Sequence, residues 1–254
     1  MSRDLFSPDG LEALRAYVEA DTLYAFDFDG TLAAITERRE DARLGVEERF
    51  LLGELARTRK VAVLSGRGRL DLISRLDGVR CESVGNHGLE TADGAPGEAH
   101  CRSTCGRWMR QLEREALPPG VELEDKGFSI SLHYRAASDP EATVRELEKR
   151  IRKLAPEARF VGGKRVLNLL PTAQVNKGTA LLALMERVHA PRAIYVGDDA
   201  TDEDVFTLGE SRILGVRVGR DEPTWASLSL GAQEEVRALL TRILRFLAER
   251  GESR

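Results

Sequence analysis

The stretch Leu23–Thr31, which reads LYAFDFDGT, decides the fold of this chain. Its first four residues are apolar, and a short apolar run without alternation is typical of a strand buried on both faces of a parallel sheet. Polar residues follow at once, beginning with Asp27 and Asp29. Ligands of open parallel sheets bind beyond the carboxyl ends of the strands. The stretch therefore predicts a parallel sheet with these two carboxylates at its ligand-binding edge.

Two further apolar runs end in polar clusters. Val61–Leu64 leads into Ser65-Gly66-Arg67, and Ala193–Val196 leads into Gly197–Asp202. Because the carboxyl ends of parallel strands meet at one edge, we expect all three clusters to lie close together, with Lys177 at the start of a nearby helix. This edge of the sheet is the predicted functional site.

The residue types at this edge indicate its chemistry. Several neighbouring carboxylates repel one another, so we expect a bound cation. Oxygen ligands without histidine or cysteine favour Mg²⁺. Zinc is not expected at His100, Cys101 and Cys105, because a second ligand pair at zinc spacing is missing. Carboxylates, a divalent cation, a lysine and a helix N-terminus together are suited to phosphoryl transfer.

The order of predicted elements divides the chain. Strands and helices alternate along residues 1–100 and again along residues 173–254, which predicts a Rossmannoid parallel-sheet core. Residues 101–172 instead follow the order helix, strand, strand, and then repeat it, with the first helix expected over 108–116. The predicted fold class is therefore α/β, with a core domain interrupted by an α+β cap domain built from a doubled αββ unit.

Composition excludes several functional classes. The 254 residues are 42% hydrophobic and 31% charged, which is ordinary globular composition. A net charge of -4 argues against non-specific binding to nucleic acid or anionic membranes. The cysteines Cys81, Cys101 and Cys105 are an odd number and cannot all pair within one chain. We expect a monomeric, cytoplasmic protein whose partner is a small molecule.

The polar clusters resemble the four motifs of the haloacid-dehalogenase superfamily, in the right order. Asp27–Thr31 resembles the first motif, Ser65 the second and Lys177 the third. Gly197–Asp199 together with Asp202 resembles the fourth. The resemblance implies a HAD-like core, with the superfamily's larger α/β cap inserted between the second and third motifs.

The resemblance also implies roles for the carboxylates. Asp27 would be the nucleophile that forms an aspartyl-phosphate. Asp29 would protonate the leaving alcohol and then deprotonate the attacking water. Mg²⁺ would be held by a carboxylate oxygen of Asp27, the backbone carbonyl of Asp29 and the side chain of Asp198. Asp199 or Asp202 would order the waters on the metal.

Other core residues would contact the phosphoryl group. Ser65 would donate a hydrogen bond to a phosphoryl oxygen. Lys177 would neutralise charge on both Asp27 and the phosphate. Thr31 and Arg67 are expected to bind the substrate.

Segments outside the four motifs resemble those of trehalose-6-phosphate phosphatases. The matching pieces are the HGxE run at His87–Glu90, the stretch Asp125–Arg135, the Gly163-Lys164 turn, and Pro171 followed by Asn176-Lys177-Gly178. The resemblance implies a phosphoric monoester hydrolase that releases trehalose and phosphate. The expected sugar-binding residues are His87, Glu90, Lys126, His133, Arg135, Lys164 and Asn168.

One position departs from that pattern. Asn168 stands where the family usually has a glutamate that is expected to contact a sugar hydroxyl. Asparagine can donate and accept hydrogen bonds, but it carries no charge. The departure leaves the phosphatase chemistry untouched. It leaves another glycosyl phosphate, such as sucrose phosphate or mannosyl-3-phosphoglycerate, as an alternative substrate.

Functions without net hydrolysis are also compatible with these residues. The chain could be a sugar-phosphate-binding regulator without turnover, or a mutase. Structurally, Asp27 and Asp29 could be turn residues that close a strand, and Gly197–Asp199 could be only the N-cap region of a helix. His133 and Arg135 could be surface residues without a ligand.

Overall fold

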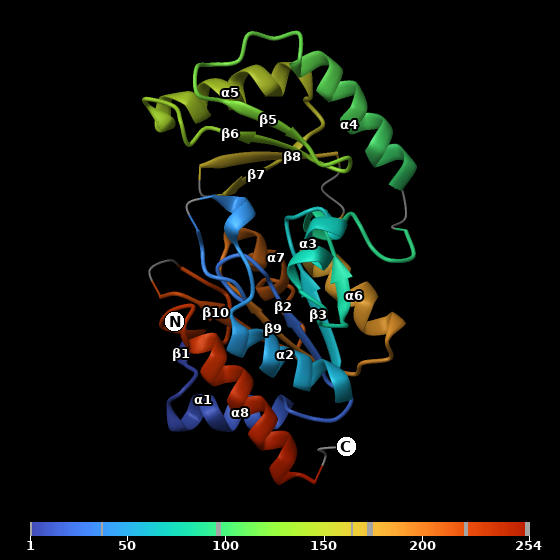
Figure 1. Ribbon diagram of the computed structural model, residues 1–254, viewed down its shortest axis with the longest axis vertical. Helices are drawn as coiled ribbons and strands as arrows, with labels where there is room; N and C mark the ends of the chain where they lie inside the picture. The colour runs from blue at the N-terminus through green and yellow to red at the C-terminus, as the bar shows by residue number, and fades with distance from the viewer. Residues whose placement is uncertain are drawn as a thin grey trace. The chain divides into compact units, whose positions relative to one another are not determined.

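The computed structural model describes residues 2–36, 38–94, 98–163, 165–171, 175–220 and 223–251. The chain forms two compact units, one from Met1–Gly88 with Lys177–Arg254 and the other from Leu89–Asn176. The first unit holds a parallel sheet and the second an antiparallel sheet, so the predicted α/β class with an inserted α+β domain is confirmed (Figure 1). The second unit begins before and ends after the predicted segment 101–172.

Within the described residues, the first unit contains a seven-stranded sheet in the order β1-β11-β10-β9-β2-β3-β4. All its pairs are parallel. The strands are β1 (Arg3–Asp4), β2 (Leu23–Phe26), β3 (Lys60–Leu64), β4 (Glu82–Val84), β9 (Ala193–Gly197), β10 (Ile213–Val218) and β11 (Leu228–Leu230). Phe26 of β2 pairs with Val63 of β3 and with Val196 of β9. These pairings place the ends of the three strands, and the polar clusters that follow them, side by side.

Helices cover both faces of this sheet. They are α1 (Pro8–Tyr17), α2 (Val46–Thr58), α3 (Arg69–Arg75), α6 (Lys177–Arg187), α7 (Glu203–Phe206) and α8 (Glu235–Glu249), with 3₁₀ turns η1 (Arg39–Asp41), η2 (Asn86–Gly88) and η3 (Ala200–Asp202). Tyr24 and Phe26 pack in the core beneath α1, α2, α3 and α8. Leu23 and Ala25 pack in a second core beneath α6 and α7. Both faces of β2 are therefore buried, which is why its sequence is apolar without alternation.

The second unit consists of two αββ repeats. Its elements are α4 (Glu98–Leu112), β5 (Glu122–Asp125), β6 (Ile130–His133), α5 (Pro140–Leu154), β7 (Arg159–Gly163) and β8 (Val166–Leu170). The antiparallel sheet has the order β5-β6-β8-β7 (Figure 1). Trp108 of α4 and Leu147 of α5 pack with Ile130 and Leu167 of the sheet. Asp139 caps α5 by accepting from the Ala142 N–H, with Pro140 at the first helical position.

Three elements differ from the sequence prediction. Among the described residues α4 begins at Glu98, so the predicted start at residue 108 is wrong. The buried side of its first half consists of Cys101, Thr104 and Cys105, which give a weak apolar pattern. Strands β1 and β11 are too short to show any periodicity and were not predicted. In the described part of the chain, no helix is both long and apolar enough to cross a membrane.

Candidate active site

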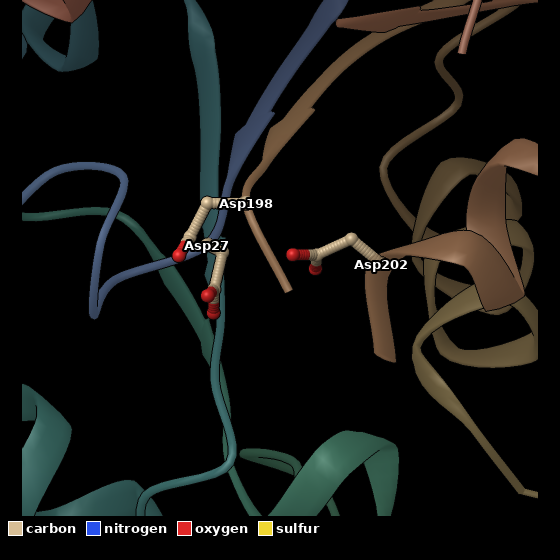
Figure 2. A group of neighbouring side chains, drawn as sticks. All are labelled: Asp27, Asp198 and Asp202. Atoms are coloured by element: carbon tan, nitrogen blue, oxygen red, sulfur yellow. The ribbon is translucent and has the colours of Figure 1, made fainter. Parts of the chain in front are cut away.

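Three carboxylates meet at the carboxyl edge of the parallel sheet. Asp27 follows β2, Asp198 follows β9, and Asp202 ends η3. One oxygen atom of each lies within 4.8 Å of one oxygen of the others. Figure 2 shows the carboxylate of Asp202 directed toward the other two, which project from neighbouring strands. Asp27 is 4% exposed and Asp202 is fully buried, so this charge is held largely away from water.

A buried lysine joins two of these carboxylates. Lys177, the first residue of α6, places its Nζ 2.9 Å from Asp27 Oδ1 and 2.7 Å from Asp202 Oδ1. Asp202 Oδ1 also accepts from the Tyr195 hydroxyl at 2.7 Å, and its Oδ2 accepts from the Asp199 N–H at 2.8 Å. Asp202 therefore anchors Lys177 against Asp27. Sequence reasoning missed the role of Tyr195. Its hydroxyl in an otherwise apolar strand indicates that it needs a buried hydrogen-bond partner, but not which residue that partner is.

Asp198 is held by the first motif. The Thr31 hydroxyl donates to Asp198 Oδ1 at 2.9 Å. Gly30 has φ +87, and a Cβ at that position would lie 2.0 Å from Asp198 Oδ2. Glycine is therefore required here both by the backbone conformation and by the close approach of the carboxylate. Thr31, which was expected to contact substrate, is fully buried and orients Asp198.

The helix-cap interpretation of the fourth motif holds for Asp199 and Asp202. Asp199 Oδ1 accepts from the Ala200 N–H at 2.8 Å, and the two aspartates form a capping box on η3. Asp198 is not part of this capping box and belongs to the carboxylate cluster, to which Asp202 also contributes. One short segment thus supplies both a capped turn and carboxylates of the cluster.

Negative charge at the cluster exceeds the charge that Lys177 can balance. Burial raises the pKa of Asp27 well above its ordinary value; Lys177 opposes this shift, and Asp202 and Asp198 add to it. Burial, followed by repulsion from Asp202, raises the pKa of Asp198 to about 7. Burial acts to lower the pKa of Lys177, but Asp202 and Asp27 outweigh it and raise that pKa. The oxygen donors and the excess negative charge fit a hard divalent cation such as Mg²⁺.

The raised carboxylate pKa values predict how stability depends on pH. A carboxyl group with a raised pKa in the folded state favours folding while it is protonated, and this contribution is lost as pH rises through that pKa. Without divalent cations, the free energy of unfolding should therefore fall as pH rises from about 4, the ordinary pKa of an aspartate, to about 7, the pKa of Asp198, and should level off above that. Urea denaturation in EDTA at a series of pH values measures this. Saturating Mg²⁺ should reduce the fall, and a flat profile in EDTA would contradict the charge assignment.

Asp29 is held by an arginine pair. Arg67 Nη2 donates to Asp29 Oδ1 at 2.5 Å and Arg67 Nε donates to Asp29 Oδ2 at 2.7 Å. The Arg67 side chain is 1% exposed, whereas that of Asp29 is 37% exposed. Ser65, which is also buried, accepts a hydrogen bond on Oγ from the Arg67 N–H at 3.2 Å. The structure therefore joins Asp29 of the first motif to Arg67, whose N–H donates to Ser65 of the second motif.

A turn with left-handed backbone supports the second motif. Asn86 and His87 have φ 50 and φ 56, a region that residues other than glycine rarely adopt. Their N–H groups donate to the carbonyls of Arg67 at 2.7 Å and Ser65 at 3.0 Å. A Cβ on Gly66 would lie 2.4 Å from the imidazole of His87. His87, expected to bind substrate, is buried against the Ser65–Arg67 loop.

In the second unit, three polar side chains gather on β5, the turn that follows it and the end of β6. His133 Nε2 lies 2.8 Å from Glu124 Oε2, and Lys126 Nζ lies 3.9 Å from the same oxygen. The Lys126 side chain is 6% exposed. Sequence reasoning missed Glu124, although it stands two residues before Lys126 on a strand and so shares its side of the alternation.

Asn168 is held inside the antiparallel sheet. Its Oδ1 accepts from the Ser131 hydroxyl at 2.6 Å, and its Nδ2 donates to the Val161 carbonyl at 3.3 Å. Arg135 is exposed and lies beyond His133, the last residue of β6. Glu90 is half-buried in the second unit. Lys164 lies outside the described residues.

Comparison with known proteins identifies the family. Residues 25–227 match the family described as trehalose-phosphatase. The chain belongs to the trehalose-phosphatase family. The trehalose-phosphate phosphatase of Mycobacterium tuberculosis is 32% identical over 271 aligned residues, which cover 95% of this chain and 67% of that protein. This trehalose-phosphatase family member thus spans about two thirds of the length of its mycobacterial relative.

Solved structures support the fold of this family member. A protein described as related to trehalose-6-phosphate phosphatase is similar with a TM-score of 0.76 and 23% identity, covering 90% of this chain and 100% of that chain. The C-terminal domain of Candida albicans trehalose-6-phosphate phosphatase is similar with a TM-score of 0.74 and 18% identity, covering 96% and 98%. The expected resemblance is confirmed, and membership of the trehalose-phosphatase family makes the chain a phosphoric monoester hydrolase.

Proposed function

We propose that this chain is a magnesium-dependent phosphatase that hydrolyses trehalose 6-phosphate to trehalose and phosphate through an aspartyl-phosphate intermediate. The observation that carries the proposal is the buried Asp27, ion-paired with Lys177 and grouped with Asp198 at the edge of the parallel sheet. The trehalose-phosphate phosphatase name of the mycobacterial relative supports the choice of substrate.

The carboxylate cluster is proposed to hold the metal. A carboxylate oxygen of Asp27, the side chain of Asp198 and the backbone carbonyl of Asp29 would be ligands. Asp202 and Asp199 would support the metal site indirectly. Their hydrogen bonds fix the backbone of the fourth motif. Mg²⁺ would supply positive charge beside the phosphoryl oxygens.

The two motif-one aspartates would perform the chemistry. An Asp27 carboxylate oxygen attacks phosphorus, and the bond from phosphorus to the sugar oxygen breaks. Asp29, in its protonated form, gives its proton to that sugar oxygen. Asp29 then takes a proton from water, whose oxygen attacks the phosphorus of the aspartyl-phosphate and releases phosphate and Asp27.

Two residues would stabilise the transferred group. The Lys177 ammonium lies between Asp27 and Asp202, where it would neutralise negative charge on both Asp27 and the phosphate. The Ser65 hydroxyl, at the end of β3, would donate to a phosphoryl oxygen. Both groups are preorganised by the buried contacts around them, so little reorganisation is needed during reaction.

Sugar recognition is proposed to come from the second unit. Lys126 and His133, both beside Glu124, would bind hydroxyl groups, with Glu90, Arg135 and Lys164 as further contacts. Asn168 would take part through Ser131, since its amide already bonds within the sheet. The uncharged Asn168 is why another glycosyl phosphate stays an alternative substrate.

Replacing Asp29 by asparagine should lower kcat by about 10²–10⁴-fold, the range that a general acid/base usually contributes. Asparagine keeps the backbone carbonyl, so Mg²⁺ affinity should change little. Steady-state phosphate release and calorimetric Mg²⁺ titration measure the two quantities. Loss of Mg²⁺ binding with the side-chain change would show that the role assigned to Asp29 is wrong.

Replacing Lys126 by alanine should raise KM for trehalose 6-phosphate more than KM for a small aryl phosphate. The reason is that Lys126 lies in the second unit, away in sequence from all four catalytic motifs. Kinetics with both substrates measure the difference. The exposed Lys153 of α5 gives a matched control, and its alanine variant should leave both KM values unchanged. An equal rise in KM for both substrates in the Lys126 variant would show that Lys126 does not recognise the sugar.

Product analysis tests the proposed function against its rivals. The proposal predicts that trehalose and inorganic phosphate appear in equal amounts from trehalose 6-phosphate. A mutase would instead yield an isomeric sugar phosphate without free phosphate. A non-catalytic regulator would bind trehalose 6-phosphate and leave it intact. Either of these results would overturn the phosphatase assignment.

A further inference from the structure

The guanidinium of Arg67 is committed to two carboxylates. Its Nη2 and Nε donate to the two oxygens of Asp29, at 2.5 and 2.7 Å, and its Nη1 donates to Asp71 Oδ2 at 3.0 Å. The side chain is 1% exposed. A planar guanidinium that meets both oxygens of a carboxylate fixes the plane and direction of that carboxylate, as well as its distance.

Arg67 is itself held from three sides. Asp71 also accepts from Arg75 Nε at 2.9 Å, so Asp71 is fixed within its own helix, α3. The Phe28 ring lies beneath the guanidinium, with Cζ 5.6 Å from the ring centroid. The carbonyl of Arg67 accepts from the Asn86 N–H at 2.7 Å, in the turn with left-handed backbone. Strained backbone of this kind persists where the surroundings hold it, and it clusters at functional sites.

We propose that Arg67 is a positioning residue for the general acid/base Asp29, rather than a ligand of the substrate phosphate. This inference rests on the role that the proposed function gives to Asp29. Arg67 holds the carboxylate so that its exposed side faces the approaching ester, while each oxygen keeps a second lone pair available for the proton. Asp71, Phe28 and the Asn86 turn hold Arg67.

The exposures separate the two possible roles of Arg67. A residue that binds the substrate phosphate must present donors to it, yet Arg67 is buried and its Nε, Nη1 and Nη2 all donate to carboxylates. Asp29 is 37% exposed and lies on the open side of the pair. The ester therefore meets Asp29 first, and Arg67 acts through it.

A double-mutant cycle tests this proposal. Lysine at position 67 keeps the charge but reaches one carboxylate oxygen at most, so Arg67→Lys should lower kcat by about 10- to 100-fold, the cost of a small misplacement of a catalytic group. In the Asp29→Asn background the same substitution should change kcat by less than about twofold, since the group that Arg67 positions is already lost. KM should stay within about twofold in both backgrounds.

A phosphate-binding role predicts a different pattern. Arg67→Lys would then raise KM, and the loss in kcat/KM would be the same in the wild-type and Asp29→Asn backgrounds, because the two effects would add. Equal losses in both backgrounds overturn the proposal.

Two further variants keep the test decisive if Arg67→Lys folds poorly. Asp71→Asn weakens the hold on Arg67 Nη1, so it should lower kcat less than Arg67→Lys does, and again only when Asp29 is present. Arg245→Lys is the matched control, because the exposed Arg245 of α8 pairs with Glu249 of the same helix, outside the Arg67 network. It should leave kcat within about twofold of the parent protein in both backgrounds. An Asp71→Asn effect that persists without Asp29 overturns the proposal.

The wild-type protein separates this inference from the proposed function. If it hydrolyses another phosphate monoester but not trehalose 6-phosphate, the proposed substrate is wrong, and the cycle is measured on the ester that it does hydrolyse. If it hydrolyses no ester, both proposals fail. If it hydrolyses trehalose 6-phosphate and the cycle is additive, only the role of Arg67 is wrong.

Discussion

Replacing Asp27 by asparagine is expected to abolish phosphate release while the protein stays folded. The amide has nearly the same shape as the carboxylate but is not a nucleophile, so no aspartyl-phosphate can form. The fold should persist because Lys177 keeps its 2.7 Å ion pair with Asp202 and because one of three mutually repelling carboxylates is removed. Phosphate release, with circular dichroism and thermal melting, measures both effects.

The matched comparison for this variant is Asp199→Asn. Asp199 lies near the same strand edge and caps η3, but it is not one of the three clustered carboxylates. It should keep measurable turnover under conditions in which Asp27→Asn has none. Near-wild-type phosphate release by Asp27→Asn would refute its role as the nucleophile.

Replacing Lys177 by methionine is expected to have the largest effect on stability. The ammonium is buried between Asp27 and Asp202, and its removal leaves two buried carboxylates without their cation. Breaking a buried ion pair from one side costs about 3–5 kcal/mol. The raised pKa of Lys177 means that its contribution is complete at neutral pH, so the loss should appear in full there.

Urea denaturation at neutral pH measures this loss, and turnover should fall with it. Lys153→Met is the control, because Lys153 is exposed on α5 and its replacement should change the free energy of unfolding by about 0.5 kcal/mol or less. An equal, small change for both variants would mean that Lys177 does not balance the charge of the buried cluster.

Sequence alone predicted the parallel sheet because its strands are buried on both faces. β2 has the predicted bounds, Leu23–Phe26, since a short apolar run that ends in polar residues has few other interpretations. The start of α4 was missed because cysteines and a threonine line its buried side. Strands β1 and β11 are held by pairing with distant neighbours, which leaves no local pattern.

Within the site, residues at strand ends were predictable and their partners were not. The approach of Asp27 to Asp198 follows from the parallel pairing of β2 with β9. The bond from Tyr195 to Asp202 and the pair of Arg67 with Asp29 depend on side-chain directions across different elements. Sequence spacing carries no record of such directions, so it predicts Arg67 as a substrate-binding residue without its contact to Asp29.

The most direct test of the central claim is a comparison of kcat/KM across glycosyl phosphates with purified protein in Mg²⁺ and in EDTA. Trehalose 6-phosphate, sucrose 6-phosphate and mannosyl-3-phosphoglycerate are the substrates, and released phosphate is measured. The account predicts the highest kcat/KM for trehalose 6-phosphate in Mg²⁺ and loss of that activity in EDTA. A higher value for another ester, or full activity in EDTA, would contradict it.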